Sequence, residues 1–198
     1  MKNKSNNMVE GYFYENKGTI CRKILTLKTI ESNVEPDLLV IMMNPGSSHP
    51  LGTSDYLNIP KSKLDKLVKT EQDYTQSRIL EFMHKNGYSH ACVLNLTDVC
   101  NSKSSKLKSE DKKYSMFKTK EEAIKILKEY MPHSKKVLIA WGCKSVFKEL
   151  IINVKTALSE LGLRKIYGLP SNKDKDLYFY HPLVRDVDWS QGVNVIDL

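Results

Sequence analysis

Two amides and an imidazole stand at the ends of apolar segments, where a chain often displays side chains that do chemistry. Asn44 follows the apolar run 38–43, Asn95 lies at the end of a second run, and His181 follows the aromatic segment 178–180. An amide offers hydrogen-bond donors and acceptors in one plane, so the asparagines suit a planar polar ligand. An imidazole can hydrogen-bond a leaving group on which negative charge develops. These residues predict a cleft for recognition, with chemistry at an anionic leaving group.

Other catalytic motifs do not match the sequence. The segment 46–50 lacks the Gly-Lys-Ser/Thr ending of a phosphate-binding loop, and no metal triad, dinucleotide glycine loop or paired nucleophile and base is recognisable. The cysteines show neither C-x-x-C pairs nor zinc-like spacing, so we expect reduced thiols, no metal and no cofactor. They are Cys21, Cys92, Cys100 and Cys143.

The elements that must position these residues alternate between strands and helices. We expect central strands at 37–43, 90–96, 136–141 and 177–180, helices at 76–86, 121–131 and 145–161, and an N-terminal hairpin of 12–14 and 20–27 around the turn 16–18. Such alternation indicates crossover connections between parallel strands, with helices on both faces. The carboxyl ends of parallel strands form one edge, which is where ligands bind in such sheets.

The sequence predicts one domain over residues 1–198, an α/β fold. Its expected architecture is a three-layer α/β/α sandwich with a central, mainly parallel four-stranded sheet, plus an N-terminal β-hairpin. Residues 1–8 are expected to be frayed, and residues 102–120 to form a lysine-rich insertion. No stretch has the length of a membrane span, so we expect no membrane partner. The reduced cysteines indicate the cytoplasm, and we expect the protein to be a monomer.

The charge of the chain favours a polyanionic partner. Lys and Arg number 31 against 23 acids, a net charge of +8, with a local excess of lysine over 102–120. Two interpretations of this stretch are open. It is either a solvated loop or a flap that contacts phosphates, with Tyr114 and Phe117 available to stack or wedge.

The order of the motifs resembles the uracil-DNA glycosylase superfamily over most of residues 37–183. Asn44-Pro45-Gly46 resembles its water-activating motif, 91–96 the strand with its base-reading Asn, 137–142 its Leu-Leu-Trp-Gly strand, and His181-Pro182 the start of its His-Pro-Ser motif. The whole pattern also resembles, more closely, a branch usually described only as a domain of unknown function. The motifs that carry this resemblance are Met-Asn-Pro at 43–45, Thr75 and Arg78, Gly87 and Tyr88, Val-x-Asn-Leu at 93–96, Ala-Trp-Gly at 140–142 and the final His-Pro-Leu at 181–183.

The resemblance implies a role for each matching residue. Asn44 would position the water that attacks the sugar C1′, Asn95 would bind the edge of the flipped base, and His181 would stabilise the departing base. The resemblance further implies base contacts by Met43, Pro45, Gly46, Ser47, Tyr56 and Trp141, and a wedge at Leu183 or Arg185 that fills the gap left by the flipped base. If the lysine-rich stretch contacts phosphates, the candidate DNA-binding residues are Lys103, Lys106, Lys108, Lys112 and Lys113, together with Arg78 on the helix that follows Thr75.

The implied function is a monofunctional DNA glycosylase that leaves an abasic site. Its substrate would be double- or single-stranded DNA with a flipped uracil-like or modified base, such as modified cytosine of phage DNA in anti-phage defence. The chain departs from the superfamily where Asn44 replaces an aspartate and Leu183 replaces a serine. Two alternatives stay open: an N-glycosidase of free nucleosides or nucleotides, and a non-catalytic nucleic-acid-binding module. Each motif alone also has a structural interpretation: a turn at Asn44, a buried hydrogen bond at Asn95, or a core residue at Trp141.

Overall fold

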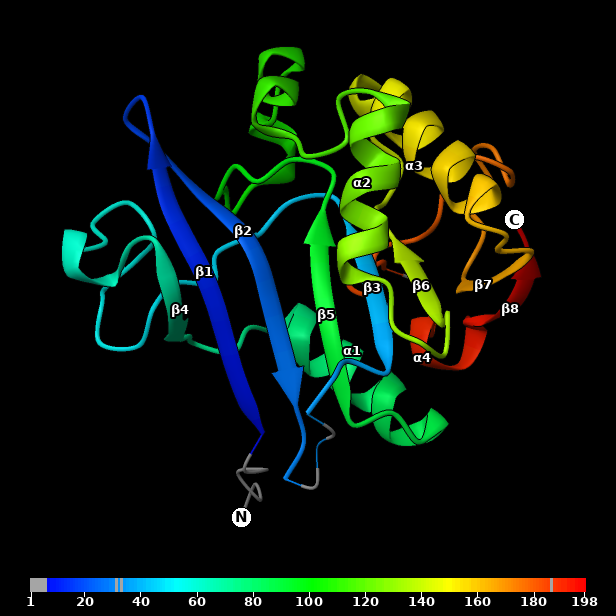
Figure 1. Cartoon of the computed structure of the whole chain (residues 1–198), viewed down its shortest axis with the longest axis horizontal. Helices are drawn as coiled ribbons and strands as arrows, with labels where there is room; N and C mark the ends of the chain where they lie inside the picture. The colour runs from blue at the N-terminus through cyan, green and yellow to red at the C-terminus, as the bar shows by residue number, and fades with distance from the viewer. Residues whose placement is uncertain (1–6, 31, 33, 186) are drawn as a thin grey trace.

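The structure is a computed structural model that describes residues 7–30, 32, 34–185 and 187–198 (Figure 1). The segment expected to be frayed, 1–8, falls mainly on residues 1–6, outside the described residues. The strands are β1 (Met8–Asn16), β2 (Thr19–Lys28), β3 (Leu38–Met42), β4 (Lys66–Lys69), β5 (His90–Asn95), β6 (Val137–Ala140), β7 (Lys165–Gly168) and β8 (Asn194–Asp197). The α-helices are α1 (Tyr74–Asn86), α2 (Lys120–Tyr130), α3 (Lys148–Glu160) and α4 (Trp189–Gly192).

The strands form one mixed eight-stranded sheet in the order β4-β1-β2-β5-β3-β6-β7-β8. The pairs β1–β2, β1–β4, β2–β5 and β7–β8 are antiparallel, whereas β3–β5, β3–β6 and β6–β7 are parallel. The expected four-stranded, mainly parallel sheet with an appended hairpin is therefore wrong, although the fold is α/β. The hairpin is an integral part of the sheet because β2 pairs directly with β5.

One expected central strand is absent from the sheet. Segment 177–180 makes only isolated bridges, from Phe179 to Gly142 and to Pro170. The short strands β4, β7 and β8 take part instead, and two of them lie at the edges of the sheet, where polar residues are tolerated because one side faces solvent.

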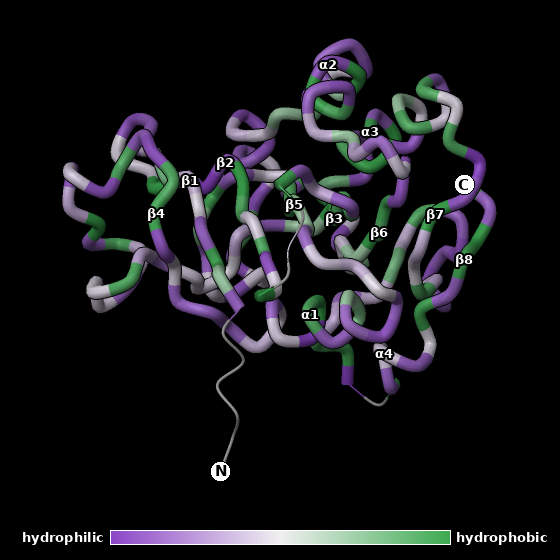
Figure 2. Tube along the Cα trace, turned by 60° about the horizontal axis from the view of Figure 1, so that its bottom comes forward, coloured by the Kyte–Doolittle hydropathy of each residue, from purple (hydrophilic) through white to green (hydrophobic). Residues whose placement is uncertain are grey.

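Helices cover both faces of the sheet, as Figure 1 shows. One core lies between the sheet and helices α2 and α3, and the other lies beneath α1 and α4. Strands β3, β5 and β6 are buried along their whole length because both of their faces are covered. In Figure 2, hydrophobic stretches mark the interior strands β5 and β6.

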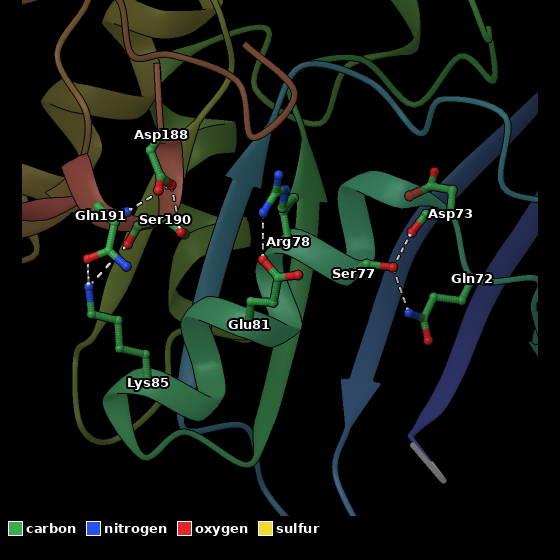
Figure 3. A network of polar contacts seen from close by, with 9 residues as sticks. All are labelled: Gln72, Asp73, Ser77, Arg78, Glu81, Lys85, Asp188, Ser190 and Gln191. Atoms are coloured by element: carbon green, nitrogen blue, oxygen red, sulfur yellow. Dashed lines mark hydrogen bonds and ion pairs between the residues drawn. The ribbon is translucent and has the colours of Figure 1, made fainter. Parts of the chain in front are cut away.

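Helix α1 has a defined start and a defined end. Asp73 accepts a hydrogen bond from the Gln76 N–H, and the Gln76 side chain accepts one from the Asp73 N–H in return, a reciprocal N-cap. Gly87 ends the helix in the left-handed region, at φ 73°. Near this end, Lys85 Nζ donates to Gln191 Oε1 at 3.2 Å and to the Ser190 carbonyl at 3.3 Å (Figure 3). These bonds tie the C-terminal end of α1 to α4.

Candidate functional site

A cleft of about 620 Å³ opens beside the end of β3, on the face of the sheet that α1 covers. Its walls come from β2, from the segment after β3, from the first turn of α1, from the loops after β5 and β6, and from segment 180–184. The structure thus brings some of the sequence-predicted residues into one cleft. They are Met43, Asn44, Pro45, Gly46, Ser47, His181 and Leu183.

Asn44 is held by a hydrogen bond through one side of its amide. Its Nδ2 donates to the Asn101 carbonyl at 2.8 Å, so the amide plane is fixed and Oδ1 is the acceptor left for a ligand or water. The next residues turn the chain sharply after β3. Gly46 has φ of 72°, a left-handed conformation that glycine adopts without strain.

His181 is a partly buried imidazole in the same cleft. Desolvation by burial lowers its pKa to about 4, so the ring is neutral at physiological pH. The Leu183 N–H donates to His181 Nδ1 at 3.2 Å, which places the proton of the neutral ring on Nε2. His181 therefore offers an uncharged N–H donor.

Gly142 lies next to Met43 and His181 in the cleft. A Cβ added there would lie 2.9 Å from Met43 Cε and 4.0 Å from His181 Cβ, and the backbone has φ of 74°. The left-handed backbone favours glycine at this position, and a Cβ would in addition require the flexible end of the Met43 side chain to move.

Arg22 is a cleft residue that the sequence analysis did not find. It lies on β2, is 3% exposed, and its Nε and Nη1 have no hydrogen-bond partner among the described residues. Burial lowers the pKa of its guanidinium. In the β1–β2 register, Tyr12 pairs with Ile24 and Phe13 with Arg22, so Lys23 is an extra residue that forms a β-bulge.

Asp98 lies beside the backbone of Arg22, whose N–H donates to the Asp98 carbonyl at 2.8 Å. The carboxyl group is buried, and Tyr14 Oη donates to its Oδ2 at 2.8 Å. Burial raises the pKa of Asp98 to about 8, against the opposing effects of the Tyr14 hydrogen bond and of Arg22. Burial thus favours the protonated form of Asp98, while Cys100, Asp73 and Asp98 act against the effect of burial on the pKa of Arg22 and raise it.

Three residues that were expected to contact the base lie outside the cleft lining. Asn95 is completely buried, and neither its Oδ1 nor its Nδ2 has a hydrogen-bond partner among the described residues. Trp141 is a core residue whose Nε1 donates to the Leu177 carbonyl at 3.0 Å. Tyr56 packs against a separate small core, and its hydroxyl accepts from the Ser102 N–H at 3.4 Å.

The lysine-rich segment lies next to the cleft, which Ser102 and Ser104 line. One of the two open interpretations had Tyr114 and Phe117 available to stack or wedge, which does not hold because both are buried in the core on the far face of the sheet. Lys112 Nζ pairs with Glu149 Oε2 at 2.9 Å. The other lysines expected to contact DNA are exposed and do not line the cleft; they are Lys103, Lys106, Lys108 and Lys113.

The outer rim of the cleft continues into a shallow groove along α1. Tyr74 and Leu183 belong to both depressions and are 82% and 48% exposed. Arg78 lies in the groove and pairs with Glu81 at 2.9 Å (Figure 3). Arg185 is exposed and lies outside the cleft lining.

Two further properties concern metals and membranes. Within the part of the chain that the structure describes, no three His, Cys, Asp or Glu side chains gather as a metal site would require. No helix among the described residues combines the length and apolar character needed to cross a lipid bilayer.

Comparison with known families corrects the expected membership in the uracil-DNA glycosylase superfamily. The matching family model is that of DUF1643, a protein family of unknown function, over residues 65–183. Neither curated proteins nor solved structures give a match. The roles that the resemblance implied are thus not supported by family membership and must be argued from the cleft itself. Since the match spans more than half of the chain, the protein belongs to the DUF1643 family, whose function is unknown.

Proposed function

We propose that the protein is a monofunctional DNA glycosylase that hydrolyses the bond between deoxyribose C1′ and a flipped base, leaving an abasic site. One observation carries the proposal: a neutral N–H donor, His181 Nε2, and a fixed amide acceptor, Asn44 Oδ1, share one cleft. A thiol also lines this cleft, but Cys143 Sγ donates to Ser171 Oγ at 3.0 Å, so it is not paired with His181 as a nucleophile would be.

In the proposed reaction, Asn44 acts on the attacking water and His181 acts on the departing base. The water oxygen bonds to C1′ while the C1′–N bond breaks and its electron pair leaves with the base. His181 Nε2–H donates to the base, and this hydrogen bond strengthens as negative charge develops there. Asn44 Oδ1 accepts from the water and orients it. An amide takes up no proton, so the proton of the water passes to solvent, which also protonates the departed base.

The rim of the cleft favours DNA over a free nucleoside as the substrate. Flipping a base costs a few kcal/mol and leaves a gap in the stack, which apolar or aromatic side chains can fill. Tyr74 and Leu183 are exposed at this rim, and the net charge of +8 favours a polyanion. We further propose that the protein acts as a monomer in the cytoplasm, on double- or single-stranded DNA. A modified base, such as modified cytosine of phage DNA, would make it an enzyme of anti-phage defence.

The test is incubation with DNA that contains uracil, mismatched thymine, hydroxymethylcytosine or glucosylated cytosine, followed by detection of alkali-labile abasic sites. Asn44→Ala and His181→Ala should abolish these sites while DNA binding is kept. Asn58→Ala and His84→Ala change exposed residues outside the cleft and serve as matched controls. DNA binding without abasic sites on any substrate would instead indicate a binding module, and release of bases from free nucleosides alone would indicate a nucleosidase.

A further inference from the structure

Arg22 combines burial with missing partners in a way that few charged residues do. A guanidinium stays charged in proteins, and an uncompensated charge inside a fold is costly. Two of its nitrogen atoms, Nε and Nη1, have no hydrogen-bond partner among the described residues, although the residue is only 3% exposed. Both atoms are almost closed to solvent, but Arg22 lines the cleft, so a ligand that enters as far as the guanidinium can supply acceptors to it.

The surroundings of Arg22 decide which kind of acceptor fits. Apolar residues of the sheet and of α1, including Leu25, Val93 and Ile79, line the same part of the molecule and belong to one core. A phosphate would need further donors for its remaining oxygens, but Arg22 is the single lysine or arginine among the described residues that line the cleft. The carboxylate of Asp73 also lines the cleft and would repel a second negative charge.

A flat ring with acceptors on one edge meets these conditions. Its faces can pack against the apolar walls while its edge accepts hydrogen bonds from the planar guanidinium. We propose that Arg22 binds the edge of a nucleobase that carries two adjacent acceptors, such as N3 and O2 of cytosine or N7 and O6 of guanine. Uracil fits less well, because its N3–H would point at the N–H donors of Arg22.

The identification of the ring as a DNA base rests on the proposed function, whereas the need of Arg22 for an acceptor does not. If the proposed function holds, the same guanidinium faces a base that gains negative charge as its bond to C1′ breaks. Arg22 would then select the base in the ground state and stabilise it as it leaves.

The test measures binding of deoxycytidine, deoxyguanosine, deoxyuridine and inorganic phosphate to the intact protein by ligand-observed NMR. The wild type should bind deoxycytidine or deoxyguanosine at least about tenfold more tightly than deoxyuridine, because a mismatched donor leaves the buried guanidinium unpaired. Arg22→Met should lose roughly 10- to 100-fold in affinity for the preferred nucleoside. Arg22→Lys keeps the charge without the planar pair of donors and should lose the selectivity. Arg164→Gln, at an exposed arginine outside the cleft, is the matched control.

Thermal unfolding separates a binding role from a structural one. Arg22→Met should be at least as stable as the wild type without ligand, because it replaces an unpartnered buried charge by an apolar side chain. A large loss of stability in both Arg22 variants would show a structural role and overturn the proposal. So would phosphate binding that depends on Arg22, or equal binding of all nucleosides. Selective nucleoside binding without DNA cleavage would refute the proposed function and leave this proposal standing. Equal cleavage of DNA with the preferred base by the wild type and by Arg22→Met would support the proposed function and refute this proposal.

Discussion

The neutral state of His181 has a consequence for stability that can be measured without any substrate. Its pKa is about 4 in the folded protein, against 6.5 for an ordinary histidine. Between these values the unfolded chain binds a proton that the folded protein does not bind. The free energy of unfolding therefore falls as the pH drops from 6.5 towards 4, and this loss is absent above pH 6.5.

The size of the effect follows from the two pKa values. With these two pKa values, the free energy of unfolding falls by about 2 kcal/mol between pH 7 and pH 5. Partial exposure of the ring reduces this loss to about 1–2 kcal/mol. Urea unfolding of the wild type and of His181→Asn at both pH values isolates the contribution, because the other titrating groups cancel in the difference. The variant should lose about 1–2 kcal/mol less than the wild type on going from pH 7 to pH 5.

His84→Asn is the matched control, since His84 is exposed on α1 and lies outside the cleft lining. It should follow the wild-type curve. If His181→Asn and the wild type lose the same stability between pH 7 and pH 5, the imidazole is not desolvated in the folded protein. The role of His181 as a neutral donor would then be refuted together with the stability argument.

Three further predictions concern residues that shape the cleft. Asp73→Ala should lower the free energy of unfolding by about 1 kcal/mol, as urea denaturation will show, because it removes the N-cap of α1; an unchanged midpoint would contradict this. Gly142→Ala should lower the free energy of unfolding by about 1–3 kcal/mol, because it combines a left-handed backbone with a clash against Met43. A crystal structure of this variant in which Met43 and His181 keep their positions would argue against the clash. Asn44→Ala should cost only about 1 kcal/mol in the same assay, for one lost hydrogen bond, while abolishing product formation. Unimpaired product formation by this variant would exclude Asn44 from the reaction.

The interior of the fold could be predicted because it depends on local patterns. Strands β3, β5 and β6 are continuous apolar runs, as expected for strands covered on both faces. Helix α1 ends at the glycine that the sequence indicates. The pairing of β2 with β5 depends on contacts between distant segments, which no local pattern encodes, so the sheet was predicted with the wrong number and direction of strands.

The cleft was predictable only in part, for the same reason. Asn44 and His181 both line the cleft, although segment 177–180, which was expected to position His181 as a central strand, is not part of the sheet. Arg22 was not identified from the sequence because Lys23 forms a β-bulge in β2. Strict alternation from Leu25 would put Arg22 on the face of the sheet opposite the cleft, whereas the bulge turns it to the cleft face. Phe117 was considered as a residue that could stack or wedge because it lies in a lysine-rich segment, whereas its side chain fills the core.

The strand order also bears on how fast the chain can fold. β3 lies between β5 and β6, which both follow it in the sequence, so Leu39 has neighbours at Cys92 and at Val137. Closing such loops costs chain entropy before the contacts form, which slows folding relative to proteins of similar size with local pairings. No N-terminal part of the chain can complete the centre of the sheet until β6 has been synthesised. The emerging polypeptide therefore leaves one edge of the apolar strand β3 unpaired while about half of the chain is synthesised, which exposes this strand to aggregation.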